Sequence, residues 1–291
     1  MDQFWIRQLI NGITQGSIYA LLAIGYSMIF GKLLLVTFAY GEIVVFGVFL
    51  GYYMHAVLGL NIFLSIILSL PMGWVFGIIV DKICYEKFRD QPRFLMLITT
   101  IGFGIFLKSF TQIIFGTGYR SYPDLIEGGV VLGGIGISYI QIFIITSTLI
   151  LMAALGYFLT NTKLGMGIKA LSVEQDAAKL VGVDVNKSIK FGHSLGCVLG
   201  IFAGVMMASF YNAFGAMMGP QLGLKAFTVV VLGGITSMPG AIIAGYILGI
   251  LENLAVAIFS SEFRNIVAFL ILIIILVFKP TGLLGKKIDL F

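Results

Sequence analysis

Long apolar runs separated by short polar segments fill most of the chain. A membrane-crossing helix needs roughly 20 apolar residues, and the runs are continuous rather than alternating, which favours helices over a closed β-barrel. The runs cover residues 8–30, 34–55, 61–80, 94–115, 139–160, 191–212, 238–258 and 265–279, with a shorter one at 224–236. We predict an all-α polytopic membrane protein, with residues 1–291 forming a single transmembrane domain of eight to nine transmembrane or broken helices.

Composition and charge agree with this interpretation. Hydrophobic residues make up 59% of the chain and charged residues 11%, against about 25% charged in soluble domains. Twelve of the 18 Lys and Arg residues lie in 82–93, 163–190 and 279–287. Basic loops stay on the cytoplasmic side of a membrane, so the excess of basic residues does not indicate nucleic-acid binding. We place 82–93, 161–190 and 281–291 in the cytoplasm, and 116–138 outside as the main external loop.

The run at 224–236 is too short for an ordinary membrane crossing. An even number of crossings must separate two cytoplasmic loops, and the count after 161–190 is even only if this run crosses. The same count puts the N-terminus outside. The run ends in Gly233-Gly234, and irregular backbone at membrane depth is tolerated only against protein or water. We therefore expect a broken helix at these glycines.

Four ionisable residues lie within the apolar runs, where charges are costly and usually paired or functional. Lys108 and Lys225 are near the ends of their runs, so we expect their ammonium groups to extend to the membrane surface. Glu42 and Glu252 lie deeper. We expect the translocation pathway to run beside Gly233-Gly234 and both acids to support this broken backbone, with contact to a substrate ammonium as the alternative.

Glycines recur at every fourth position of one run. Small residues at this spacing let helices approach closely in lipid. The longest stripe consists of Gly192, Gly196, Gly200 and Gly204. Shorter ones are Gly12/Gly16/Ala20 and Ala241/Gly245/Gly249. The long stripe predicts packing against another helix, within this chain or across a subunit interface.

No signature of an enzyme or of a nucleotide site stands out. The segment 102–109 resembles a phosphate loop, but Leu107 replaces the glycine that must precede the lysine. His55 and His193 lack partners at ligand spacing, and we expect Cys84 and Cys197 to be free thiols. We therefore expect neither catalysis nor a metal or cofactor on this chain.

The most polar segment, 163–190, contains a short helix with its own end signals. Ser172 and Gln175 have the spacing of a capping box, and Gly182 is placed to end the helix in a left-handed conformation. A short helix in the largest cytoplasmic loop predicts a docking element for a cytosolic partner.

This helix also carries a resemblance. Asp176-Ala177-Ala178-x-x-x-Gly182 resembles the Glu-Ala-Ala-x-x-x-Gly loop of ABC importer permeases, with Asp176 in place of glutamate. The N-terminal NGITQGSIYALLAIGYSMIFG and VTFAYGEIVVFG, and the C-terminal GLKAFTVVVLGGITSMPGAIIAGYILGILEN and VFKPTGLLGKK, resemble the branched-chain amino acid type. The chain is similar over its whole length to the shorter of that importer's two permease subunits.

The resemblance implies a multi-pass permease of the bacterial cytoplasmic (inner) membrane. The implied partners are a second permease in a heterodimer, two ATPase subunits that bind ATP and magnesium, and an external solute-binding protein that delivers leucine, isoleucine or valine. The implied ATPase-coupling residues are Ser172, Gln175, Asp176, Ala177, Ala178, Leu180, Val181 and Gly182.

Three alternatives compete with this interpretation. An ABC permease for urea, another amino acid or an amide would share these motifs. A secondary transporter would show inverted repeats and no docking helix, so the helix at 172–182 argues against it. A membrane-embedded enzyme would show clustered His, Asp or Glu within the spans, and such clusters are missing.

Overall fold

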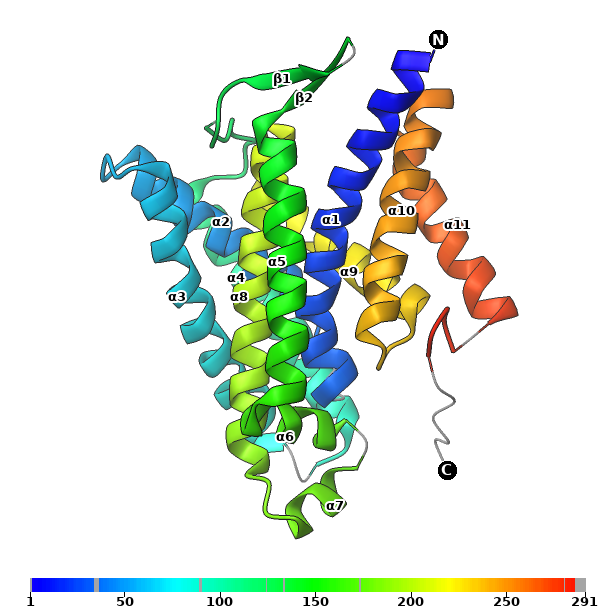
Figure 1. Cartoon of the computed structure of the whole chain (residues 1–291). Helices are drawn as coiled ribbons and strands as arrows, with labels where there is room; N and C mark the ends of the chain where they lie inside the picture. Colours follow the sequence, from blue (N-terminus) through cyan, green and yellow to red (C-terminus); the bar gives the residue numbers. More distant parts are fainter. Residues whose placement is uncertain are drawn as a thin grey trace.

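The computed structural model describes residues 2–33, 37–88, 91–123, 125–132, 134–172, 174–279 and 281–285. Figure 1 shows a bundle of helices with one small hairpin at its upper end, which confirms the predicted all-α class. The α-helices are α1 (Asp2–Leu33), α2 (Tyr40–Ala56), α3 (Ile62–Val80), α4 (Arg93–Phe115), α5 (Tyr139–Asn161), α6 (Lys163–Leu171), α7 (Gln175–Leu180), α8 (Val185–Tyr211), α9 (Gly219–Gly233), α10 (Met238–Ile258) and α11 (Phe263–Phe278). The short elements are η1 (Asp81–Tyr85), η2 (Glu86–Phe88), η3 (Ala216–Met218), β1 (Gly129–Leu132) and β2 (Ile135–Ser138).

Every predicted apolar run corresponds to a helix. Seven helical segments of the described chain are long and apolar enough to cross a membrane by length and composition. They lie in α1, α3 with η1 and η2, α4, α5, α8, η3 with α9, and α10. Helices α2 and α11 are shorter, with 17 and 16 residues. The run at 224–236 is extended at its start by η3, which brings this segment to 18 residues.

Helix α1 packs along α10 through two glycine stripes that face each other. A Cβ on Gly12 would lie 2.9 Å from the Cα of Ile250, and a Cβ on Gly249 would overlap the backbone of Gly16. A Cβ on Gly245 would lie 2.6 Å from the amide nitrogen of Ala20. Because no side chain separates the backbones, α1 and α10 run in close contact, as both figures of the fold show.

The fourfold glycine stripe of α8 packs inside this chain. A Cβ on Gly196 would lie 2.6 Å from the carbonyl oxygen of Gly25 on α1. A Cβ on Gly200 would lie 2.6 Å from the Tyr40 hydroxyl on α2, and Gly204 also faces α2. The sequence left open whether the stripe packs within this chain or across a subunit interface. These three glycines pack against helices of this chain.

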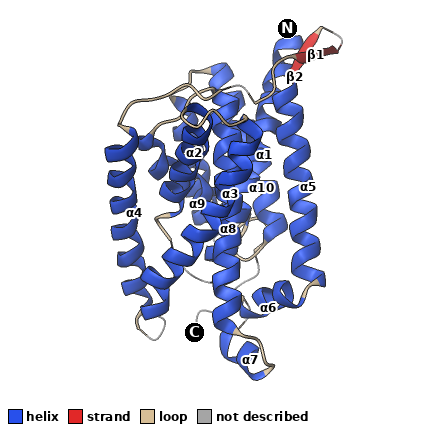
Figure 2. Cartoon of the chain, turned by 90° about the vertical axis from the view of Figure 1, so that its left-hand side faces the viewer, coloured by secondary structure: helices blue, strands red, loops and turns tan. Residues whose placement is uncertain are grey.

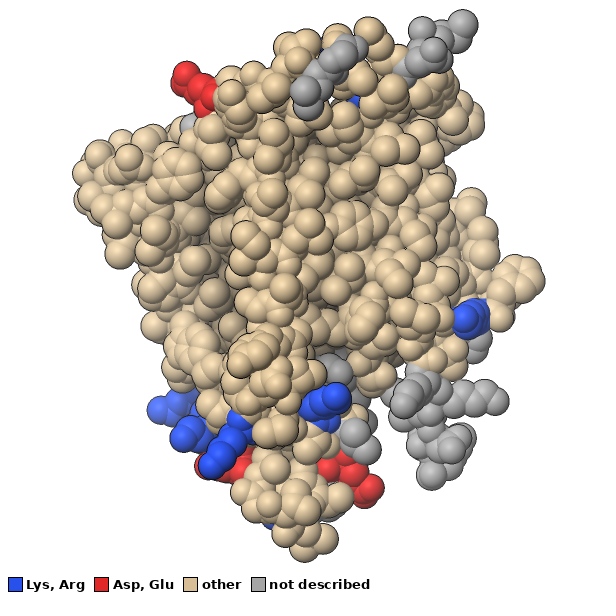
Figure 3. Space-filling model, viewed as in Figure 1, with Lys and Arg blue, Asp and Glu red and all other residues tan. Residues whose placement is uncertain are grey.

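The two ends of the bundle differ in charge. The N-terminus and the β1–β2 hairpin lie at one end, and α6 and α7 lie at the other (Figures 1 and 2). Figure 3 shows Lys and Arg gathered around the α6–α7 end. There Lys190 Nζ lies 3.2 Å from Glu86 Oε1, which ties the loop after α3 to the start of α8. The arrangement agrees with the predicted sides, while residues 286–291 of the tail lie outside the described residues.

The segment 116–138, which we predicted to be the main external loop, holds structure that the sequence analysis did not predict. Strands β1 and β2 pair antiparallel from Gly129 opposite Ser138 to Leu132 opposite Ile135. The backbone of Arg120 also exchanges hydrogen bonds with that of Phe214, at 2.8 and 3.0 Å. The loop is thereby fixed to the segment between α8 and η3.

Helix α9 ends at the predicted break. Gly234 has a φ of +104°, in the region that favours glycine. The amides of Leu283 and Leu284 donate to the carbonyls of Leu232 and Gly233, at 2.8 and 3.1 Å. Residues 283 and 284 therefore satisfy two carbonyls of the irregular backbone, so that protein packs against this break.

Candidate functional site

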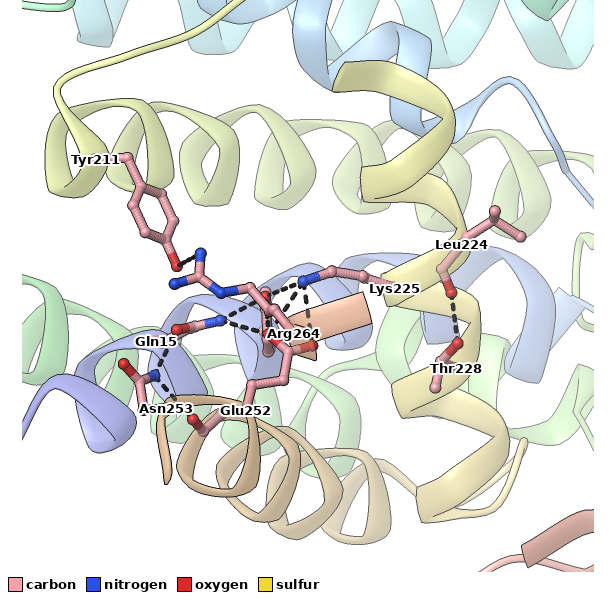
Figure 4. Close-up of polar contacts among 10 residues, drawn as sticks. Gln15, Tyr211, Leu224, Lys225, Thr228, Glu252, Asn253 and Arg264 are labelled. Atoms are coloured by element: carbon pink, nitrogen blue, oxygen red, sulfur yellow. Dashed lines mark hydrogen bonds and ion pairs between the residues drawn. The ribbon is translucent and has the colours of Figure 1, made fainter. Parts of the chain in front are cut away.

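A buried ion pair joins α9 to α10. Lys225 Nζ lies 3.0 Å from Glu252 Oε2, and the two residues are 6% and 0% exposed. The expectation that Lys225 extends to the membrane surface is wrong, because its side chain is directed inward to this carboxylate (Figure 4). A charge at membrane depth needs such a partner.

Two residues of α1 complete the cluster around the pair. The Tyr19 hydroxyl donates to Glu252 Oε2 at 2.7 Å and accepts from Lys225 Nζ at 2.6 Å. Gln15 Nε2 donates to the same carboxylate oxygen at 2.6 Å, and its carbonyl oxygen accepts from Asn253. The Glu252 carboxylate thus accepts from three different side chains, so its buried charge is fully compensated.

A second cation lies beside this cluster, and no acid among the described residues is paired with it. Arg264, near the start of α11, donates from Nη1 to the Tyr211 hydroxyl at 3.0 Å. Its guanidinium also lies 5.1 Å from the centre of the Tyr211 ring. Among the described residues its Nε is buried and has no hydrogen-bond partner. Figure 4 shows the guanidinium directed at Tyr211, close to the Lys225–Glu252 pair.

Two cavities meet at Tyr211 and Arg264. The larger, of about 670 Å³, lies among α1, α5, α8 and α10 and reaches the external loop at Glu127. The smaller, of about 250 Å³, is bounded by the end of α8, the start of α9 and the start of α11, and reaches Lys225. Tyr211 and Arg264 line both. The pair therefore lies where the larger cavity adjoins the smaller one, which we call the inner cavity because it reaches the buried Lys225.

Neither predicted carboxylate lies beside the break at Gly233. Gly233 packs against Gly240, and Glu252 is twelve residues further along α10, roughly 18 Å at 1.5 Å per residue. Glu42 lies instead against Gly219, the first residue of α9, where an added Cβ would overlap its carboxylate. The prediction that Glu42 and Glu252 support the break at Gly233-Gly234 is wrong. A carboxylate at a helix N-terminus is favourable, which accounts for Glu42, 6% exposed, at that place.

Helix α7, which we predicted to be a docking element, begins later than expected. The N-cap residue of α7 is Glu174, and the Ser172 hydroxyl donates to the Lys169 carbonyl at 2.7 Å, at the end of α6. The predicted capping role of Ser172 is therefore wrong. The side chains of Gln175 and Asp176, also assigned to ATPase coupling, lie outside the described residues.

The end of α7 is as predicted. Gly182 has a φ of +83°, and its amide donates to the Lys179 carbonyl at 3.0 Å. The Val183 amide donates to the Ala178 carbonyl at 3.0 Å. These two bonds form a Schellman motif, which requires the left-handed residue that glycine supplies.

The exposed side of α7 is only part of the predicted contact surface. Leu180 is 88% and Val181 77% exposed, and Ala177 is also exposed. Ala178 is 3% exposed, because α7 packs that side against α6 and α8 of this chain. Its assignment as a partner contact is wrong. Figure 1 shows α7 projecting beyond the rest of the bundle.

The remaining candidate groups of the sequence analysis lie within the helical bundle. The phosphate-loop lookalike is part of the continuous helix α4. Cys84 and Cys197 are free and buried. His193 is buried beside Tyr85, with ring centres 5.2 Å apart, and neither ring nitrogen has a hydrogen-bond partner among the described residues.

Sequence reasoning missed most of the cluster. Gln15 and Tyr19 are 1% exposed within the first apolar run, four positions apart and so on one face of α1. That spacing of two hydrogen-bonding side chains was a usable signal. Arg264 and Tyr211 lie at the ends of their runs, where a polar residue is ordinary, so the sequence alone gives no reason to single them out.

The comparisons with known proteins agree with this architecture. Residues 8–276 match the family described as branched-chain amino acid transport system / permease component. The high-affinity branched-chain amino acid transport system permease protein BraD of Pseudomonas aeruginosa is 33% identical, and LivH of Escherichia coli 32%; each alignment covers 97% of this chain and 96% of the relative. The ribose import permease protein RbsC of Haemophilus influenzae is 26% identical over 99% of this chain and 89% of its own length.

A solved structure shows the same fold. PsaBC from Streptococcus pneumoniae, in complex with Fab, superposes with a TM-score of 0.53 at 14% identity, covering 94% of this chain and 91% of that one. The family match over most of the chain and the two relatives above 30% identity decide the assignment. The chain is a multi-pass membrane protein that belongs to the branched-chain amino acid transport system permease component family.

Proposed function

We propose that this chain is one of two permease subunits of an ATP-driven importer for leucine, isoleucine, valine or related neutral amino acids. The names of its relatives BraD and LivH support the solute class. In this role the chain is not an enzyme: it provides the passage, and partner ATPases bind ATP and magnesium. The chain itself takes no cofactor.

The observation that carries the proposal is the geometry of α7. A six-residue helix leaves the membrane bundle at its basic end and presents Leu180 and Val181 almost fully to solvent. Exposed apolar side chains on a helix are the usual anchors for a groove on another protein. Because α7 packs on α6 and α8, movement of a bound ATPase would be passed to α8, whose glycine stripe contacts α1 and α2.

The remaining partners follow from the sides of the bundle. A solute-binding protein would deliver the amino acid at the end that holds the external loop and the 670 Å³ cavity. A second permease would cover part of the apolar surface of this one. Two ATPases would occupy the opposite end, where Lys and Arg gather (Figure 3).

One specific observation favours a second candidate solute. The relative RbsC is a ribose import permease of similar length, so this architecture is compatible with a polar solute that is not an amino acid. Urea and other small amides belong to the same alternative. The same permease architecture would serve for each of these solutes.

The test is purification of the chain in mild detergent, with mass spectrometry of the proteins that co-purify, followed by reconstitution of that assembly in vesicles. We expect two ATPases, a second permease and ATP-dependent uptake of leucine that requires the external binding protein. Uptake of ribose or urea in place of leucine would establish the second candidate. Uptake that persists without ATP or any ATPase would contradict both.

A further inference from the structure

We infer that Arg264 binds the carboxylate of the transported amino acid at the junction of the two cavities. This inference rests on the proposed function, because it assumes an amino acid as the solute. It assigns a solute-binding residue within this chain, in the cavity between α8, α9 and α11.

The first argument is the balance of charge. Two cations, Lys225 and Arg264, line the inner cavity. Lys225 is neutralised by Glu252 at 3.0 Å. Among the described residues Arg264 has a tyrosine hydroxyl as its hydrogen-bond acceptor and no acid. An anion bound beside it would supply the missing charge, and such a pair is strengthened where water is scarce.

The second argument is the hydrogen-bonding capacity of the guanidinium. A guanidinium has five N–H donors in a fixed plane and binds carboxylates through two parallel bonds. Nη1 of Arg264 is used by Tyr211, whereas Nε is buried without a partner among the described residues. A buried donor without a partner is costly. Because Nε is covered in this conformation, a carboxylate would satisfy it once the guanidinium turns toward the cavity.

The third argument is the lining of the inner cavity. The lining combines polar and apolar side chains. The polar side chains besides the two cations are Tyr211, Gln221, Ser261 and Asn265. The apolar ones are Met207, Met218 and Leu222. The volume of about 250 Å³ is just below the range of roughly 300–1,000 Å³ of sites for drug-sized ligands, as a small solute requires.

A branched-chain amino acid has the matching chemistry. Its carboxylate would bind Arg264, its aliphatic side chain would contact the methionines and leucine, and its ammonium would meet the amide oxygens of Gln221 and Asn265. Among the described residues no acid lines the inner cavity, so the carboxylate rather than the ammonium provides the stronger anchor. The Tyr211 hydroxyl accepts a hydrogen bond from the guanidinium, and both residues also line the larger cavity.

The experiment measures direct binding to the assembled transporter in nanodiscs, without the external binding protein. The probes are leucine, 4-methylpentanoate, which lacks the ammonium, and isoamylamine, which lacks the carboxylate. We expect the unaltered complex to bind 4-methylpentanoate better than isoamylamine. In Arg264→Gln, leucine and 4-methylpentanoate should bind roughly tenfold more weakly or worse, as when a hydrogen bond to a charged group is lost, while isoamylamine should be unaffected.

Two further variants separate recognition from structural damage. Arg264→Lys keeps the charge without the planar fork and should restore part of the preference for the anion. Arg7→Gln changes an exposed arginine at the same end, which lines a different cavity, and should leave all three affinities unchanged. A uniform loss of all probes in Arg264→Gln, or no loss, would overturn the inference.

The proposed function is judged independently in the same preparation. If the unaltered complex fails to transport leucine with all partners present, the function proposal fails first. If it transports leucine and Arg264→Gln keeps the anion preference, only the carboxylate site fails.

Discussion

Lys225 Nζ and Glu252 Oε2 lie 3.0 Å apart, with side chains 7% and 0% exposed, and they join α9 to α10 inside the bundle. An isolated charge at membrane depth costs about 2.5–3.5 kcal/mol on insertion scales. Each charge therefore offsets the free-energy cost of burying the other. Gln15 and Tyr19 extend the link to α1, so three helices share one polar cluster.

Glu252→Gln should destabilise the protein strongly, because it leaves the Lys225 charge buried without an acid. Removal of one partner of a buried pair costs about 3–5 kcal/mol. The measurement is thermal unfolding of the purified complex. The double variant Lys225→Met/Glu252→Gln should recover most of the loss, since neither charge then remains.

Uptake by the double variant distinguishes the two roles considered for Glu252. Normal leucine uptake by a stable double variant would show that the pair is structural. A stable double variant without uptake would place the pair in the passage. A single variant as stable as the parent would contradict the structural account altogether.

Gly200→Leu should prevent correct folding. Even a Cβ at this position would lie 2.6 Å from the Tyr40 hydroxyl, and overpacking of a tight site costs roughly 1–3 kcal/mol or more. The control is Phe202→Leu on the same helix, which adds no bulk at a half-buried position. Fluorescence-detected size-exclusion chromatography should show a monodisperse peak for the control alone. Equal profiles would mean that α8 can move away from α2.

Much of the fold could be predicted because the membrane restricts the choices. Each apolar run of about 20 residues became a helix, and the basic loops ended at one face. The hairpin at 129–138 was missed because its strands are only four residues each, within glycine-rich sequence. The shorter glycine stripes were visible, but their pairing depends on how α1 and α10 come together.

Less of the site could be predicted, for a physical reason. Burial of Lys225 depends on a carboxylate 27 residues away on another helix, and run boundaries suggested a surface location instead. Ala178 belongs to a motif, yet a motif does not say which side of a six-residue helix the rest of the chain covers. Arg264 could not be singled out because its hydrogen bond to Tyr211 and the two cavities that it lines depend on how separate helices pack.

Impermeant thiol labelling should confirm the sides of the membrane. In a background without Cys84 and Cys197, Ser121→Cys is exposed at the hairpin end, and Lys187→Cys is exposed at the α7 end. Ser188 next to it is 3% exposed and is unsuitable, because burial would block labelling from either side. In intact cells the reagent should label Ser121→Cys alone. Labelling of Lys187→Cys from outside would invert the assignment.

The two sides of α7 should respond differently to substitution. Leu180→Asp places a charge on a side chain that is 88% exposed. It should leave the unfolding temperature unchanged and abolish co-purification of the ATPases, because an apolar anchor is lost at the proposed contact. Ala178→Leu, at 3% exposure, should weaken the packing of α7 on α6 and α8, and so lower stability along with ATPase binding.

Gly182→Val tests the turn that follows the helix. A non-glycine residue in the left-handed conformation costs about 1–2 kcal/mol, and valine is branched at Cβ. Nothing lies within 4 Å of a Cβ at this position, so the effect would come from the backbone alone. It should loosen α7 and reduce ATPase binding without a steric clash. The matched control is Gly59→Val, because Gly59 also has a left-handed φ, of +66°, and an added Cβ there likewise has nothing within 4 Å. ATPase binding lost equally in the control would show that the assay reports general damage, whereas full binding by Leu180→Asp and Gly182→Val would remove α7 from the interface.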